Sequence, residues 1–65
     1  MIYVNGDEQQ DATTVAALLE RLGFGERARG LAVALDGEVV PRSEWHSAQL
    51  APGARVEVVG ATQGG

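Results

Sequence analysis

One stripe of apolar residues at helical spacing most constrains the fold of this chain. Its members, at positions i, i+3, i+4 and i+7, are Val15, Leu18, Leu19 and Leu22. Residues at this spacing lie on one face of an α-helix, so we expect one main helix. Thr13-Thr14 is placed to cap the first free amides of this helix, and Gly23 is placed to end it.

The remaining apolar segments are short and predict strands joined by tight turns. Asn5-Gly6 and Asp36-Gly37 favour the turns of β-hairpins, in which both central residues have positive φ. The predicted strands span residues 1–4, 8–10, 31–35, 38–40 and 55–59. In the last strand Val56 and Val58 are predicted to face inward, and Val59 outward. Residues 41–45, which begin with Pro41, predict an irregular or single-turn helical connection.

One helix can cover only one face of such a sheet, which predicts an α+β fold. We expect a mixed sheet of four to five strands wrapped on the helix, with its other face open to solvent or to a partner. A chain of 65 residues holds a single domain, here 1–65, and buries about 60% of its unfolded surface. Residues 60–65 are predicted to form a flexible C-terminal tail. The helix stripe is expected to pack on Leu31, Val33, Leu35, Val56 and Val58.

Composition argues against several classes of function. The net charge is −4 and the five arginines are scattered, which does not suit phosphate binding, so no nucleic-acid partner is expected. The chain has no cysteine and no lysine, which excludes a thiolate metal site, a thiol nucleophile and Schiff-base chemistry. No apolar run is long enough to cross a membrane and no signal peptide is evident. We therefore expect a cytoplasmic protein that is a monomer when free and binds no membrane.

Two internal features favour structural roles over chemical ones. Residues 23–28 match the G-x-G-x-x-A pattern of dinucleotide sites, but they follow a helix instead of a strand, so we interpret them as a helix end and a loop. His46, the only histidine, has no companion at metal-binding or catalytic spacing and is expected in an exposed loop. Trp45 is predicted to close the edge of the core.

The last residues, Gln63-Gly64-Gly65, point to chemistry at the C-terminus. Glycines have no side chains, so an arm that ends in them can enter a narrow channel that any Cβ would block. The arm presents the α-carboxylate of Gly65, which becomes reactive once ATP converts it to an acyl-adenylate on another protein. The cargo could be an amine or sulfur. With no cysteine present, the C-terminus would be the only group able to hold sulfur.

Four segments together resemble the bacterial sulfur carrier proteins of thiamine biosynthesis (ThiS), a family with the ubiquitin-like β-grasp fold. They are YVNG, TVAALLERLG, LAVALDGEVVPRSEW and PGARVEVVGATQGG, and they span the whole chain. The most specific parts are the V-V-P-R-S-E-W segment and the Q-G-G end. The departures are Asp36, where asparagine is frequent, Ala54, where an acidic residue is common, and Thr62, where a branched apolar residue is usual.

The resemblance implies a carrier that is acted on by enzymes and is not itself one. An E1-like adenylyltransferase of the ThiF type would use ATP to adenylate Gly65, and the chain would bind no cofactor of its own. A relay that starts from a cysteine desulfurase would supply sulfur for a thiocarboxylate, and thiazole synthase of the ThiG type would accept it. Gly64, Gln63 and Thr62 would occupy the partner channels. The partner-docking face would consist of Val59, Ala32 and Ala34.

Two alternatives share the Gly-Gly end. The small subunit of molybdopterin synthase has the same fold and thiocarboxylate, but its members are usually longer and lack the P-R-S-E-W segment. A ubiquitin-like protein modifier would join its carboxylate to an amine. A stand-alone enzyme ranks last, because the chain has no room for an enclosed active site.

Overall fold

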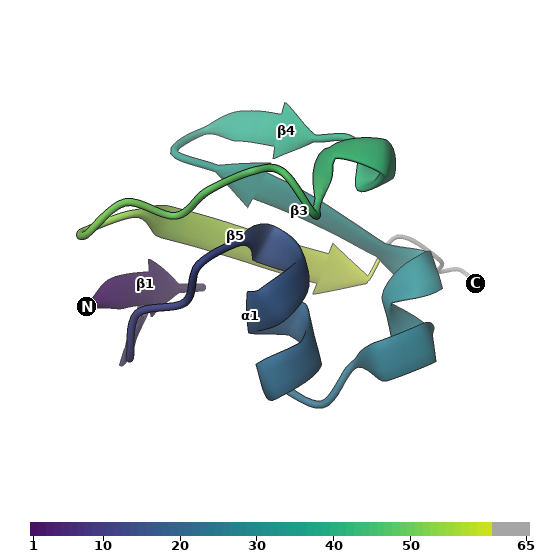
Figure 1. The fold of residues 1–65 in the computed structure, drawn as a ribbon, viewed down its shortest axis with the longest axis horizontal. Coiled ribbons are helices and arrows are strands. Elements are labelled where there is room, and N and C mark those ends of the chain that lie inside the picture. The colour runs from purple at the N-terminus through teal and green to yellow at the C-terminus, as the bar shows by residue number, and fades with distance from the viewer. Residues whose placement is uncertain (61–65) are drawn as a thin grey trace.

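A five-stranded sheet packs one of its faces on a single α-helix, α1 (Figure 1). The computed structural model describes residues 1–60, and at residues 26–28 it describes the backbone only. The strands are β1 (Ile2–Val4), β2 (Asp7–Gln9), β3 (Leu31–Leu35), β4 (Glu38–Val40) and β5 (Arg55–Gly60). The helices are α1 (Val15–Arg21) and two 3₁₀-helices, η1 (Gly25–Gly30) and η2 (Arg42–Glu44).

The strand order is β2-β1-β5-β3-β4, which places the last strand in the centre of the sheet. β1 runs parallel to β5, and the other neighbouring strands are antiparallel. The sheet is therefore mixed, and the predicted α+β class with β-grasp architecture is confirmed. β3 and β4 have the predicted bounds, and the bounds of the other three strands differ from the predicted ones by at most one residue. In particular, Gly60 belongs to β5, one residue beyond the predicted end of the strand.

Both predicted hairpin turns have the expected backbone geometry. Asn5 and Gly6 have φ values of 52° and 88°, and Asp36 and Gly37 have values of 50° and 89°. Positive φ at both central residues is the property of the type I′ turn, whose twist matches that of the flanking strands. These two turns connect β1 to β2 and β3 to β4.

The helix α1 begins and ends as its sequence predicts. The hydroxyl of Thr14 accepts a hydrogen bond from the amide of Ala17 at 3.1 Å, which caps the N-terminus. At the other end Gly23 has a φ of 88°, and the Phe24 amide donates to the carbonyl of Leu19 at 3.1 Å. These are features of a Schellman motif. The chain then forms η1, where the sequence predicted only an irregular loop.

The core lies between α1 and the covered face of the sheet. In α1, Val15, Leu18 and Leu19 are buried, and Leu22 is half-buried against them. The sheet contributes buried residues from three strands, namely Ile2, Val4, Val33, Val56 and Val58. Leu31 and Leu35 pack against this cluster while remaining partly exposed. The predicted inward direction of Val56 and Val58 and the predicted contribution of the helix stripe are confirmed.

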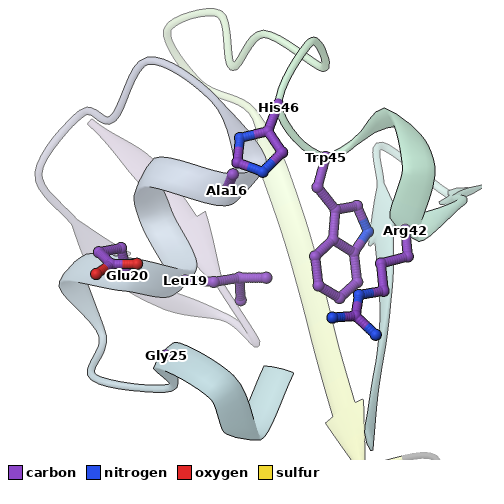
Figure 2. A pocket seen from close by; sticks show the side chains of 7 residues that line it. All are labelled: Ala16, Leu19, Glu20, Gly25, Arg42, Trp45 and His46. Atoms are coloured by element: carbon purple, nitrogen blue, oxygen red, sulfur yellow. The ribbon is translucent and has the colours of Figure 1, made fainter. Parts of the chain in front are cut away.

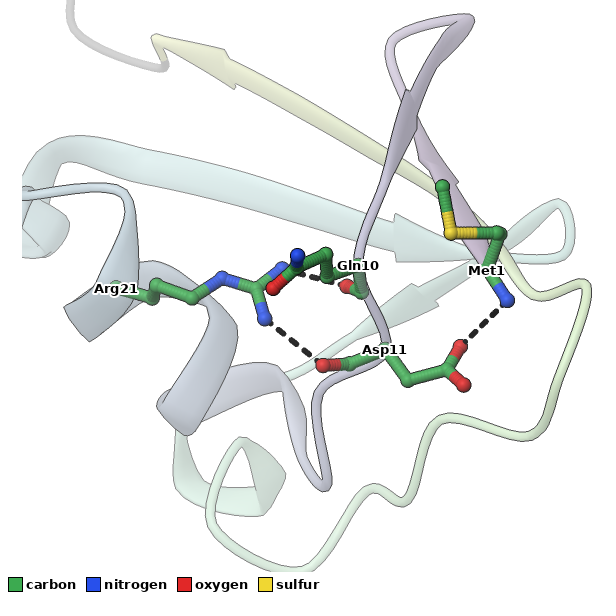
Figure 3. A network of polar contacts seen from close by, with 4 residues as sticks. All are labelled: Met1, Gln10, Asp11 and Arg21. Carbon is green, nitrogen blue, oxygen red and sulfur yellow. Dashed lines mark hydrogen bonds and ion pairs between the residues drawn. The ribbon is translucent and has the colours of Figure 1, made fainter.

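Polar contacts connect α1 to the segment that precedes it (Figure 3). The Arg21 guanidinium donates to the backbone carbonyls of Asp11, at 2.8 Å, and Gln10, at 2.6 Å. The N-terminal ammonium of Met1 forms an ion pair with Asp11 at 2.8 Å, and both groups are more than half exposed. An exposed pair of this kind contributes at most about 1 kcal/mol to stability. No helix within residues 1–60 has the length and apolar character needed to cross a membrane.

Candidate functional site

The predicted site combines the C-terminal residues with the face of the sheet that α1 does not cover. β5 is the central strand, so it leads the chain toward its end from the middle of the sheet. Its last residue, Gly60, pairs with Leu31 at the start of β3. The predicted site residues Thr62, Gln63, Gly64 and Gly65 lie outside the described residues. The described part of the chain ends at Gly60, two residues before Thr62.

The three residues predicted to form the docking face lie together on the open face. Val59 of β5 is directly opposite Ala32 of β3, and Ala34 is opposite Glu57. Residues directly opposite each other in a ladder project to the same side of the sheet. Val59 is 57% exposed, and the two alanines are half-buried. The docking-face residues are thus adjacent in the fold, close to the end of β5, although a role in binding stays a prediction.

Val39 of β4 extends this surface and was missed in the sequence. It lies opposite Ala34 and is 76% exposed. The signal was present, because the alternation of a strand places Val39 and Val40 on opposite faces, and Val40 packs against the core. We call Val59, Ala32, Ala34 and Val39 the apolar patch. The apolar patch extends across three neighbouring strands, from β5 through β3 to the edge strand β4.

The other half of the open face is polar. Tyr3 of β1 lies beside Arg55 of β5 in the parallel ladder, and the Arg55 guanidinium is 6.0 Å from the centre of the tyrosine ring. This is the outer limit for a cation–π interaction. Glu8 of β2 is opposite Tyr3, and Glu57 follows on β5, so the charges alternate in sign. An open hollow of about 360 Å³ lies beside Tyr3, Arg55 and Glu57. The open face therefore offers an apolar half next to the end of β5 and a charged half beside the start of β5.

A smaller hollow of about 160 Å³ lies on the helix side, between α1, Gly25 and η2 (Figure 2). Typical small-molecule pockets measure about 300–1,000 Å³. Trp45 forms one wall and is only 6% exposed, with its indole N–H donating to the carbonyl of Val40 at 2.9 Å. The prediction that Trp45 closes the edge of the core is confirmed.

His46 follows Trp45 in the same hollow and is exposed, as the sequence predicted. Glu20 and Arg42 also line the hollow (Figure 2). Within residues 1–60 no three or more histidine, aspartate or glutamate side chains gather in a way that could hold a metal ion. The charged residues of this hollow form no recognisable catalytic arrangement.

Comparison with known proteins gives a consistent result. The sequence model of the ThiS family matches residues 1–65. The crystal structure of a thiamine biosynthesis protein, ThiS, from Geobacter metallireducens superimposes with a TM-score of 0.82 at 29% sequence identity. The matched region covers 98% of this chain and 97% of that protein. No curated protein matches the sequence.

Proposed function

Because the chain belongs to the ThiS family, we propose that it is a sulfur carrier of thiamine biosynthesis that holds its sulfur at Gly65. The observation that carries the proposal is the extent of the family match, which runs to residue 65 and so includes Gln63-Gly64-Gly65. The similarity to a thiamine biosynthesis protein over nearly the whole length of both chains supports the same pathway. It favours thiamine biosynthesis over the alternatives of molybdopterin synthase and a protein modifier.

The proposed chemistry takes place on partner enzymes. A carboxylate oxygen of Gly65 attacks the α-phosphate of ATP on an adenylyltransferase of the ThiF type, and pyrophosphate leaves. The terminal sulfur of a persulfide, supplied by a relay that begins at a cysteine desulfurase, then displaces AMP from the acyl-adenylate and forms an acyl disulfide. A thiol reductant cleaves the S–S bond of this acyl disulfide and releases the thiocarboxylate. The resulting thiocarboxylate donates its sulfur on a thiazole synthase of the ThiG type. The chain itself contributes an accessible C-terminus and a surface that docks on these partners.

The geometry of residues 1–60 supports the proposal that this chain docks on its partners and presents its C-terminus to them. β5 ends in the centre of the sheet, and the apolar patch lies next to that end. A partner that binds the apolar patch would have the following residues, 61–65, within reach. Five residues span at most about 18 Å when extended. A reacting centre buried about that far inside a partner is therefore accessible to Gly65.

The test is a mass measurement on the product. The intact protein is incubated with the adenylyltransferase, ATP, a cysteine desulfurase with cysteine, and a thiol reductant. We expect it to gain the mass difference between sulfur and oxygen, and fragmentation should place that gain on Gly65. Sulfur on any other residue, or no gain at all, would contradict the proposal.

Two variants separate the chemistry from the fold. Deletion of Gly65 moves the carboxylate back by about 3.5 Å, and a displacement of 1 Å can already cost about 10²-fold in rate. Gly64→Val keeps the length but adds a branched side chain inside the partner channel. Both variants should fold, dock and gain no sulfur. A shortened chain that still acquires sulfur would show that Gly64-Gly65 has no part in the reaction.

A further inference from the structure

β1 is too short to pair with β5 along the whole length of β5. β1 ends at Val4, and its parallel pairing with β5 covers only Tyr3 opposite Arg55 and Val4 opposite Val56. The chain then turns away at Asn5-Gly6, while β5 continues to Gly60. On the other side, β3 pairs with β5 as far as Leu31 opposite Gly60. Within residues 1–60, the second half of β5 therefore has a neighbouring strand on one side only.

On the side of β5 that lacks a neighbouring strand, the side chain of Asn5 forms the hydrogen bonds that such a strand would form. The Val58 amide donates to Oδ1 of Asn5 at 2.9 Å, and Nδ2 of Asn5 donates to the Val58 carbonyl at 3.1 Å. The backbone amide of Asn5 also donates to the carbonyl of Val56 at 2.9 Å. Asn5 thus satisfies both backbone groups of Val58 as an adjacent strand residue would. The two side-chain bonds are partly buried and connect residues 53 positions apart.

Few residue types can combine these contacts with the turn. Asn5 has a φ of 52°, in the left-handed region that glycine, asparagine and aspartate tolerate best. Of these three, only asparagine has a side chain with both a donor and an acceptor. Aspartate could accept from the Val58 amide, but as a carboxylate it would face the Val58 carbonyl without a proton to donate.

We propose that Asn5 is a positioning residue for sulfur loading, an inference that rests on the proposed function. By holding β5 on its second side up to Val58, Asn5 extends two-sided support to within two residues of the end of the strand. The direction in which the chain leaves Gly60 is then fixed relative to the apolar patch. A partner docked on that patch then meets the end of β5 in a defined position and direction. Asn5 therefore acts on the reaction through β5 without touching the reacting atoms.

The opposite end of β5 provides a matched control. Asp36 is also the first residue of a type I′ turn, with a φ of 50°. Its Oδ1 accepts from the Arg55 amide at 2.9 Å, and its own amide donates to the Arg55 carbonyl at 2.7 Å. Asp36 supports the start of β5, and Asn5 supports the part next to its end. Glycine at either position keeps the turn and removes the side-chain hydrogen bonds.

The test compares Asn5→Gly with Asp36→Gly in the full chain. Sulfur gain is followed with the adenylyltransferase, ATP and the desulfurase, at several concentrations of carrier. We expect Asn5→Gly to lower kcat by about 3- to 10-fold, because a loosened end of β5 presents the reactive terminus in the productive position less often. Its KM should stay within about twofold of the wild-type value, since the apolar patch is intact. Asp36→Gly should leave both constants near the wild-type values.

Amide hydrogen exchange on the free proteins supplies the structural readout. Exchange of the Val58 amide should accelerate in Asn5→Gly and stay unchanged in Asp36→Gly. If Asn5→Gly does not fold, Asn5→Asp replaces it, because it keeps the turn and the acceptor and loses only the donor. The Val58 amide then keeps its acceptor, so the lower kcat alone is the expected result for this variant. Equal kcat values for the Asn5 and Asp36 variants would overturn the positioning role. A wild-type protein that gains no sulfur would instead overturn the proposed function, so the two failures are distinguishable.

Discussion

Leu19 shows most directly how the helix stripe stabilises the domain. Its side chain is 2% exposed and belongs to the core cluster that joins α1 to the sheet. We predict that Leu19→Ala lowers the free energy of unfolding by about 2–5 kcal/mol, because the substitution leaves a cavity that the short chain cannot fill. This is a large share of a small domain's total stability of about 5 kcal/mol.

Urea denaturation of Leu19→Ala and Leu22→Ala measures this difference. Leu22 belongs to the same predicted stripe but is half-buried, so its truncation should cost clearly less. Equal losses for both variants, or a loss below about 0.5 kcal/mol for Leu19→Ala, would show that the stripe does not face the core as described.

Some residue roles were invisible in the sequence because they depend on distant partners. Asn5 was predicted from the Asn-Gly pair as a turn residue, and its φ confirms that. Its hydrogen bonds to Val58 join residues 53 positions apart, and no local pattern indicates such a contact. Val39, by contrast, lies on the open face as strand alternation requires, and the sequence already held that information.

The helix α1 has only seven residues, which is too short for a helix to be stable alone in water. The helix must therefore be stabilised by packing against the sheet and by hydrogen bonds at its two ends. We predict that Thr14→Ala destabilises the protein by about 1 kcal/mol, because the Ala17 amide loses its side-chain acceptor. Thermal unfolding followed by circular dichroism measures the loss.

Thr13→Ala is the matched control for this cap. Thr13 is exposed, and its contribution to the structure is the backbone carbonyl that accepts from the Leu50 amide at 2.9 Å. That bond survives the substitution, so the change in stability should stay within about 0.5 kcal/mol. A larger loss for Thr13→Ala than for Thr14→Ala would contradict the assigned cap.

The elements were predictable where a local period or a turn signal exists. The apolar spacing of α1, the two Xaa-Gly turns and the alternation in β3 and β5 each correspond to an observed element. η1 was missed because this 3₁₀-helix of glycines, charged residues and one alanine has no apolar period. The parallel pairing of β1 with β5 joins the first and last strands of the described chain, and no local sequence pattern indicates such a long-range pairing.

Considered as a whole, the sheet has one face that is buried and one that is open. One face of the sheet is buried against α1 and holds the fold together, while the other presents the apolar patch. Neighbouring exposed apolar residues beside the proposed reactive end are what an interface would present. Because the two faces share strands but not side chains, substitutions on the open face should affect docking and leave folding intact.

Part of the candidate site was predictable, because strand alternation assigns each residue to one face of the sheet. Val59, Ala32 and Ala34 could be placed on the open face because alternation and a single covering helix leave them no other direction. That they lie beside one another near the end of β5 depends on the antiparallel register of β3 and β5. No local sequence pattern indicates that register, because it is set by the pairing of residues far apart in the chain.

Val59→Asp tests whether docking and folding are separable. Val59 is 57% exposed, so a carboxylate there remains solvated, and the melting temperature should change little. On docking, the same carboxylate would be buried without a partner. We therefore predict that affinity for the adenylyltransferase falls by about tenfold or more, as measured by calorimetry. Val39→Asp introduces the same charge on the edge strand β4, farther from the end of β5, and should weaken binding less. Unchanged binding by both variants would remove the apolar patch from the interface, whereas loss of folding by Val59→Asp would place Val59 in the core.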